Sequence, residues 1–211
     1  MHFKDLSQLP RLALGDPAVT PVLDLVVSHA SSRAFRRSPL LRSQLAALLK
    51  GISINRIGGQ TNYAGSLRTY PSAGARYPVD TYLLVLQSED VEPGAYFFDP
   101  RDFSIRQISH RDYVNAVVEV FGEGWTADAS LVVFFVAQWH RSNIKYGDRG
   151  FAYAYIEAGH MAQNLILIAR HLGLAICPVG GFWEDRVEGI FRLVTPEESP
   201  LYALLIGVGK D

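Results

Sequence analysis

"KYGDRGFAYAYIEAGHMAQNLILIARHLGL", residues 145–174, holds the longest helical pattern in the chain. Its apolar side chains recur every three or four residues and therefore share one helix face: Ala154, Ala158, Met161, Leu165, Ile168 and Leu172. Gly173 predicts the end of the helix, because glycine readily adopts the left-handed conformation that closes one. Small residues near the start, including Gly159, would let a second backbone approach closely. We expect Lys145 and Tyr146 on a surface loop at the mouth of this helix.

The rest of the chain predicts a mixture of helices and strands. Helical periodicity or N-capping residues mark four further helices, at residues 20–29, 39–50, 113–121 and 185–191. Runs of β-branched and aromatic residues predict strands at 80–86, 95–99, 103–108, 131–138, 175–180 and 201–208. Residues 52–70 show no clear period and predict a long loop. Because helices and strands do not alternate regularly, we expect an α+β fold in a single domain over residues 1–211.

The composition narrows the class of protein. Apolar residues make up 48% and charged residues 19% of 211 residues, as in a globular chain. A net charge of −1 does not favour nucleic-acid binding. The single cysteine, Cys177, excludes an internal disulfide and a multi-cysteine metal site, and we expect it as a buried structural thiol. We find no membrane-spanning run, signal-peptide pattern, nucleotide-binding glycine motif or HExxH motif, so we expect a cytoplasmic protein without a bound metal.

Three segments outside the long helix could bind a ligand. Residues 29–37, HASSRAFRR, concentrate hydroxyl and guanidinium groups that suit a phosphate, although a solvated interhelical loop is the alternative. Residues 71–78, PSAGARYP, carry a glycine that permits close approach of a flat ligand, or form an ordinary turn. Residues 177–185, CPVGGFWED, would leave bare glycine amides after a buried strand, or simply connect a strand to a helix.

The adjacent Lys145 and Tyr146 are a candidate acid–base pair. A tyrosine that accepts a proton must first be ionised, and a neighbouring cation favours the ionised form. Side chains adjacent in sequence do not automatically point toward one another, so two exposed residues of no catalytic role are the alternative.

Taken together, the three segments and the stretch around Lys145 and Tyr146 resemble the nitroreductase-like flavoproteins, and within them the SagB-type, McbC-like azoline dehydrogenases. The resemblance covers about residues 28–210 and is carried by RTYPSAGARYPVDTYLLV, the long helical stretch and PVGGF. It implies a flavin-reductase fold, with a central antiparallel sheet wrapped by helices, in an intertwined homodimer. FMN would lie at the dimer interface, two per dimer, and the long helix would form part of that interface.

The resemblance also implies which residues hold FMN. Those residues are Ser31 and Arg33 in the first segment, Ser72 and Gly74 in the second, Gly180 and Gly181 near flavin N5 and O4, and Lys210 on the phosphate. The family often has two arginines where this chain has His29 and Ala30. Either one phosphate contact is then missing, or Arg36, Arg37 or Arg68 supplies it.

The subfamily carries a Lys-Tyr pair at the place of Lys145 and Tyr146. Converting an azoline into an aromatic azole removes a proton from the α-carbon and a hydride from the neighbouring ring carbon. The hydride would go to flavin N5 and the proton to Tyr146, assisted by Lys145. Asp148 and Arg149 would fix the loop.

Three functions therefore compete. The first is an FMN-dependent azoline dehydrogenase acting on a ribosomal peptide or a carrier-bound nonribosomal chain. The second is an NAD(P)H-dependent nitro or quinone reductase, which needs no such base. The third is a non-catalytic scaffold subunit that stabilises a cyclising partner. The chain is short for the subfamily, so we expect an azoline-containing peptide to be captured with the help of a cyclodehydratase or a carrier protein.

Overall fold

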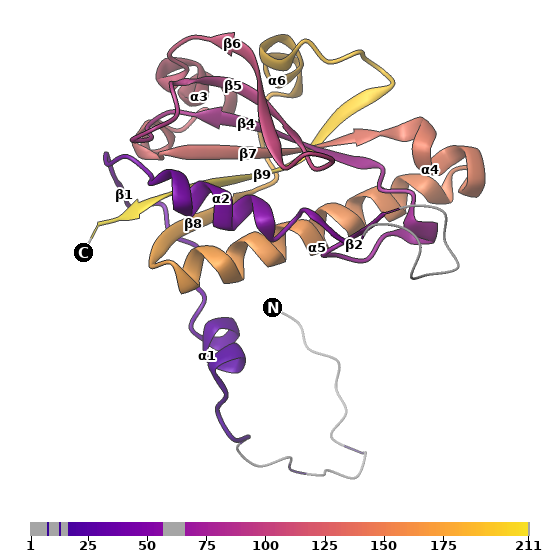
Figure 1. Ribbon diagram of the computed structural model, residues 1–211, viewed down its shortest axis with the longest axis horizontal. Coiled ribbons are helices and arrows are strands. Elements are labelled where there is room, and N and C mark those ends of the chain that lie inside the picture. The colour runs from indigo at the N-terminus through magenta and orange to yellow at the C-terminus, as the bar shows by residue number, and fades with distance from the viewer. Residues whose placement is uncertain (1–7, 9–12, 14–16, 57–65, 211) are drawn as a thin grey trace.

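The computed structural model describes residues 8, 13, 17–56 and 66–210, and it has the expected α+β architecture (Figure 1). The helices are α1 (Pro21–Val27), α2 (Arg42–Lys50), α3 (Val114–Phe121), α4 (Trp139–Tyr146), α5 (Arg149–His171) and α6 (Glu184–Phe191). The strands are β1 (Phe35–Arg36), β2 (Ile54–Arg56), β3 (Leu67–Arg68), β4 (Val79–Val85), β5 (Gly94–Asp99), β6 (Ser104–His110), β7 (Leu131–Gln138), β8 (Leu174–Val179) and β9 (Glu198–Gly209). Short 3₁₀ turns are η1 (Ala73–Ala75) and η2 (Gly124–Asp128).

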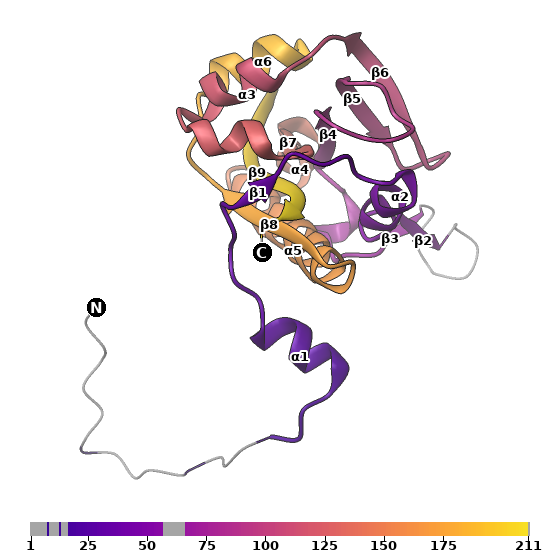
Figure 2. The ribbon, with the colours of Figure 1, turned by 90° about the vertical axis from the view of Figure 1, so that its left-hand side faces the viewer.

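The seven-stranded sheet is antiparallel throughout its paired strands. Its order is β1-β9-β7-β4-β5-β6, with β8 also paired to β9. Figure 2 shows α2 and α5 on one side of the sheet and α3 and α6 on the other. Among the described residues, no helix combines the length and the apolar character needed to cross a bilayer.

Strand β7 lies at the centre of the core and is buried along its whole length. Leu131, Val133 and Phe135 join the cluster beneath α2 and α5. Val132 and Phe134 join the cluster beneath α3 and α6. Side chains of a strand point alternately to its two faces, so a strand of apolar residues needs cover on both sides. The helices on both faces therefore follow from this run of sequence.

Helix α5 largely confirms the apolar face read from the sequence. Ala154, Ala158, Met161 and Leu165 are buried, whereas Ile168 and Leu172 are half-buried at its end. The helix ends at His171, and Gly173 follows with a φ of 70°, as the sequence predicted.

The structure corrects two predicted elements. Helix α2 begins at Arg42 and not at residue 39, because the buried Leu40 forms a β-bridge with Ser88 and keeps the chain extended there. The expected loop at 52–70 contains β2 and β3, which pair with each other, although residues 57–65 lie outside the described part.

A third correction concerns the Lys145–Tyr146 pair. Both residues lie in the last turn of α4, and not on a surface loop. The chain then turns at Gly147, with a φ of 53°, and enters α5. The two helices place both side chains on rigid backbone, which fixes their positions more closely than a loop would.

Helix α4 is held to the sheet by a two-point ion pair. Arg141 donates to both carboxylate oxygens of Asp80, at 2.7 and 2.8 Å, and also to the carbonyl of Tyr77 at 3.1 Å. The Asp80 side chain is 9% exposed, so the guanidinium supplies partners that water cannot. Paired hydrogen bonds of this kind fix orientation as well as distance.

We expect Arg141→Ala to destabilise the fold by about 3 kcal/mol, because it leaves a nearly buried carboxylate without its partner. The matched control is Arg186→Ala, which breaks an ion pair with Glu119 whose side chains are 47% and 63% exposed. That loss should stay below about 1 kcal/mol. Urea unfolding of both variants measures the difference, and equal losses would contradict this account.

Candidate functional site

The turn at residues 71–79, which includes η1, has an unusual backbone. Gly74, Ala75 and Tyr77 have φ values of 58°, 50° and 47°. The left-handed region is open to glycine but costs other residues free energy, and such conformations persist only where surrounding contacts hold them. Strained backbone of this kind is concentrated at functional sites.

Gly74 lies directly against the Lys145–Tyr146 pair. A β-carbon built on Gly74 would lie 2.5 Å from the phenol oxygen of Tyr146 and 3.0 Å from Nζ of Lys145. Nζ of Lys145 lies 5.2 Å from the centre of the Tyr146 ring. The ring of Tyr153 packs edge-on against the Tyr146 ring, with 4.9 Å between the two ring centres. The fold thus brings together two segments that lie about 70 residues apart in the sequence.

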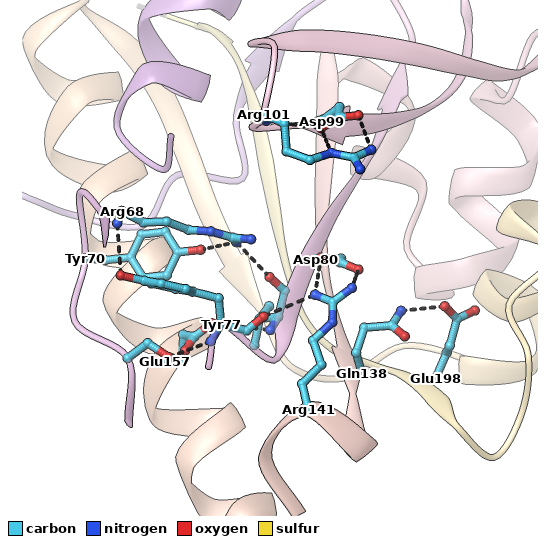
Figure 3. A network of polar contacts seen from close by, with 12 residues as sticks. Arg68, Tyr70, Tyr77, Asp80, Asp99, Arg101, Gln138, Arg141, Glu157 and Glu198 are labelled. Atoms are coloured by element: carbon cyan, nitrogen blue, oxygen red, sulfur yellow. Dashed lines mark hydrogen bonds and ion pairs between the residues drawn. The ribbon is translucent and has the colours of Figure 1, made fainter. Parts of the chain in front are cut away.

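On the other side of the turn, Arg68 and two tyrosines form a compact cluster (Figure 3). Arg68 donates a side-chain hydrogen bond to the hydroxyl of Tyr70 at 2.7 Å, and its guanidinium lies 4.7 Å from the ring centre of Tyr77. The hydroxyl of Tyr77 accepts the backbone amide of Arg68 at 2.9 Å. Burial raises the pKa of Tyr70 above its ordinary value, so this phenol stays neutral and is not a base. An open hollow of about 460 Å³ lies along this cluster and reaches Ser72 and Gly74.

Beneath the turn lies Glu157, a carboxylate on the buried face of α5 that is only 1% exposed. Its Oε1 accepts the backbone amide of Val79 at 3.2 Å, whereas Oε2 has no hydrogen-bond partner among the described residues. Burial raises the pKa of Glu157 to about 7, against the opposing influence of the Ser72 hydroxyl and the Val79 amide. The hydroxyl of Ser72 itself accepts the amide of Tyr77 at 2.9 Å and so closes the turn internally.

Ser31 and Arg33 lie elsewhere, beside β8. The amide of Ser32 donates to the carbonyl of Ile176 in β8 at 3.0 Å, and this hydrogen bond holds the segment beside that strand. Both Ser31 and Arg33 are exposed, and the guanidinium of Arg33 lies 5.9 Å from the ring centre of Trp125.

Lys210 lies at the end of β9, close to this segment. Its backbone amide donates to the carbonyl of Ala34 at 3.0 Å. Its ammonium group lies 3.2 Å from a carboxylate oxygen of Asp128, and Arg37 lies 3.5 Å from the other oxygen. Two cations therefore share one half-buried carboxylate, which leaves the site with excess positive charge.

Gly180 and Gly181 follow β8 directly. Both are exposed, and a side chain at either position would meet nothing within 4 Å, so the backbone is accessible to a ligand. Cys177, three residues earlier, is 2% exposed, and burial raises the pKa of its thiol. The expected burial of this thiol is confirmed.

The predicted residues thus form two groups within one copy of the chain. The turn group is Ser72, Gly74, Lys145 and Tyr146. The strand group is spread along β8 and β9: Ser31, Arg33 and Lys210 lie toward the C-terminal end of β9, whereas Gly180 and Gly181 follow Val179, which pairs with Ala203 earlier in β9. No hydrogen bond or ion pair between described residues joins them. Figure 1 shows α4 at one end of the sheet, and β1 and the C-terminal end of β9 at the other. In the ranges that the structure describes, no cluster of three or more His, Cys, Asp or Glu residues could hold a metal ion.

Comparison with known proteins gives the family. The model of the nitroreductase family matches residues 26–210. The chain belongs to the nitroreductase family. The match includes both groups of residues and every strand of the sheet, in agreement with the α+β fold.

Individual relatives within and around the nitroreductase family differ in their named roles. A Methanocaldococcus jannaschii protein that is named as a nitroreductase by assignment is 34% identical to this chain over 192 residues, which cover 89% of each chain. The microcin B17-processing protein McbC of Escherichia coli is 26% identical over 156 residues, 68% of this chain and 55% of McbC. The E. coli microcin synthetase complex McbBCD with truncated pro-MccB17 bound contains a chain of the same fold. Its TM-score is 0.73 at 21% identity, with 96% of this chain and 79% of that chain covered.

Nitroreductase-family proteins typically bind a flavin, and the strand group has the chemistry to hold one. The cations Arg33, Arg37 and Lys210, moderated by Asp128, suit a phosphate ester. The open backbone after β8 suits the edge of a flat heterocycle. At Gly74 the space that a side chain would fill is taken by Tyr146 and Lys145, so the close approach that this glycine permits is to those side chains.

Glu157 and Arg141 contribute to the turn group, but neither was predicted from the sequence. Glu157 carried a detectable signal, because it falls between Ala154 and Met161 on the apolar face of its helix. A carboxylate at such a position must be buried or must distort the helix. The pairing of Arg141 with Asp80 had no local signal, since 61 residues separate the two.

We expect Gly74→Ala to destabilise the fold by about 2 kcal/mol, since it adds a β-carbon both in the left-handed region and against Tyr146. Gly122→Ala is the matched control, with a φ of 69° and open space around the position. The control should cost about 1 kcal/mol, from the backbone alone. Equal losses in urea unfolding would show that the packing against Tyr146 contributes nothing.

Glu157 should make stability depend on pH. Its carboxyl keeps its proton up to about pH 7 in the folded chain, against an ordinary pKa of 4.5. The unfolded chain therefore binds fewer protons between these values, and stability falls as pH rises through that window. Relative to Glu157→Gln, which cannot ionise, the parent chain should lose about 3 kcal/mol between pH 4 and pH 8. Denaturant unfolding at several pH values measures this, and a constant difference between the two proteins would exclude it.

Proposed function

We propose that this nitroreductase-family protein is an FMN-dependent azoline dehydrogenase. In this proposal it oxidises thiazoline or oxazoline rings in a peptide to thiazoles or oxazoles. The observation that carries the proposal is the packing of Lys145 and Tyr146 against Gly74. A phenol with a cation over its ring, held on helical backbone, is a suitable proton acceptor.

The chemistry requires two groups to leave neighbouring ring carbons. The α-carbon loses a proton, the adjacent carbon loses a hydride, and a carbon–carbon double bond forms between them. In this proposal the phenolate form of Tyr146 takes the proton, and the ammonium group of Lys145 lies over its ring. Bound FMN supplies the acceptor for the hydride. The positive charge of Lys145 remains beside the phenol after the transfer and holds the side chain in place.

The proposed cofactor site requires a second copy of the chain. Ser31, Arg33, Gly180, Gly181 and Lys210 would hold FMN in one copy, and the turn group with Ser72 and Gly74 would come from the other. Of the three arginines considered for the missing phosphate contact, Arg37 lies beside Lys210, whereas Arg68 belongs to the turn cluster.

Unpartnered apolar surface supports this homodimer. Helix α1 has no buried residue and stands away from the sheet in both ribbon views (Figures 1 and 2). It nevertheless carries apolar side chains, and Val22 and Val27 are each 67% exposed. On the outer face of α5, Tyr155 and Ile156 are 57% and 55% exposed beside Gly159. Apolar side chains gathered on one face of a helix usually mark an interaction surface.

The proposed substrate is a peptide delivered with the help of a partner, either a cyclodehydratase or a carrier protein. The likeness to McbC and to a synthetase complex with a precursor bound supports a peptide and partner subunits. The alternative function, an NAD(P)H-dependent nitro or quinone reductase, is supported by the higher identity to the M. jannaschii relative.

Tyr146→Phe separates these functions, because it removes the proton acceptor but keeps the ring and its packing. With FMN bound, oxidation of a synthetic thiazoline peptide should fall by about 10²–10⁴-fold, the usual contribution of general acid–base catalysis. Lys145→Ala should act in the same direction. Reduction of p-nitrobenzoate by the chemically reduced protein should hardly change, since it needs no base on the substrate carbon.

The measurement is the pair of rates for each variant, together with FMN content. A parallel fall in both rates would assign the two residues to FMN binding or to the fold. Azoline oxidation at the parent rate in both variants would remove the main support for the proposal. Absence of azoline oxidation in the parent, with normal nitro reduction, would favour the alternative function.

A further inference from the structure

Glu157 has no role in the proposed proton transfer, yet its environment is unfavourable for a carboxylate. It is 1% exposed, and no ion pair within the described part of the chain includes it. The Val79 amide and the Ser72 hydroxyl are polar groups close to the carboxylate, but Oε2 has no hydrogen bond among the described residues. A buried charge without an opposite charge costs free energy that an amide or an apolar residue would not. Such a group is a candidate for a role in the site that it adjoins.

Glu157 contacts the segment that presents Gly74. Its hydrogen bond to the amide of Val79 fixes the point where the turn ends and β4 begins. Arg141 fixes the carbonyl of Tyr77 from α4, and Ser72 fixes the amide of the same residue from within the turn. The left-handed conformations of the turn therefore persist because several polar contacts act together.

We propose that Glu157 is a positioning residue for the Lys145–Tyr146 pair. It holds the turn from beneath, so that Gly74 lies against both side chains and keeps Tyr146 in the orientation that accepts a proton. The inference rests on the proposed azoline oxidation and adds a residue that acts on it only through the turn.

Because Glu157 can ionise, a positioning role should make the rate of azoline oxidation depend on pH. A hydrogen bond from an amide to an ionised carboxylate is stronger than one to a neutral carbonyl. Burial raises the pKa of Glu157 to about 7, so its charge changes across neutral pH. The charged and ionisable groups facing it are Arg68 and Tyr70, with Asp80, which Arg141 pairs. The hydrogen bond from the Val79 amide should therefore be stronger above pH 7 than below it, although burying the charge costs the fold as a whole some stability.

The test compares the parent with Glu157→Gln, which keeps the shape and one carbonyl acceptor but cannot ionise. Both are assayed as FMN-loaded protein with a synthetic thiazoline peptide and, separately, with p-nitrobenzoate, from about pH 6 to about pH 8. The ratio of parent to variant azoline-oxidation rates should be near one at the low end. It should rise to about 10-fold or more at the high end, since small misplacement of a catalytic group is costly. The corresponding ratio for nitro reduction should remain constant with pH.

Asn164→Ala is the matched control on the same helix. Asn164 also fixes backbone with side-chain hydrogen bonds, donating to the carbonyls of Gly51 at 2.9 Å and of Thr69 at 3.4 Å, but among the described residues it has no hydrogen bond to residues 71–79. Its azoline and nitro rates should change by the same factor at every pH. This control separates loosening of α5 from loosening of the turn.

Each other result has one meaning. A parent-to-Gln ratio that is flat with pH for azoline oxidation overturns the inference and leaves the proposed function standing. A parallel loss of both activities also overturns it, because Glu157 then serves the fold or the flavin. Absence of azoline oxidation in the parent, with normal nitro reduction, overturns the proposed function itself, and the positioning role with it.

Discussion

Burial of β7 on both faces is the constraint on which the rest of the structure depends. A strand with apolar side chains on both faces cannot leave either face to water, and its burial on each side supplies the main driving force for packing helices there. The long α5 covers one face, and its small residues let it lie close to the sheet. That closeness carries the N-terminal part of α5, and α4 before it, to the end of the sheet where β4 begins.

The position of α4 and α5 decides the site. Once α4 is docked through Arg141, its last turn can only face the segment that leads into β4. The close contact between Gly74 and the Lys145–Tyr146 pair is therefore a consequence of core packing and one ion pair. The strained conformations in the turn are tolerated because contacts from α4, α5 and the turn itself fix it at several points.

Three buried carboxylates show how differently the fold treats the same chemical group. Asp99 is fully buried, but hydrogen bonds from Arg101, with further help from Arg106, hold its pKa well below the ordinary range. Asp80 is paired by Arg141 in a two-point contact. Glu157 has no guanidinium bound to it, and burial raises its pKa to about 7. The first two are compensated structurally, whereas the third keeps an ionisation near neutral pH next to the proposed site.

Local sequence determined much of the fold of this protein. The period of α5, its end at Gly173, the buried run of β7 and the mixed α+β class all follow from the spacing of apolar side chains, which depends only on helix and strand geometry. Local sequence also pointed to the Lys145–Tyr146 pair and to the segment around Gly74 as separate features. It could not predict where α2 begins, because the β-bridge of Leu40 to Ser88 overrides the helix signal at residue 39. Only the tertiary structure brought Gly74 against Tyr146, paired Arg141 with Asp80 and placed Glu157 beneath the turn. These contacts join residues 60 to 80 positions apart, and such pairings are set by the packing of whole elements and not by any local preference of the chain.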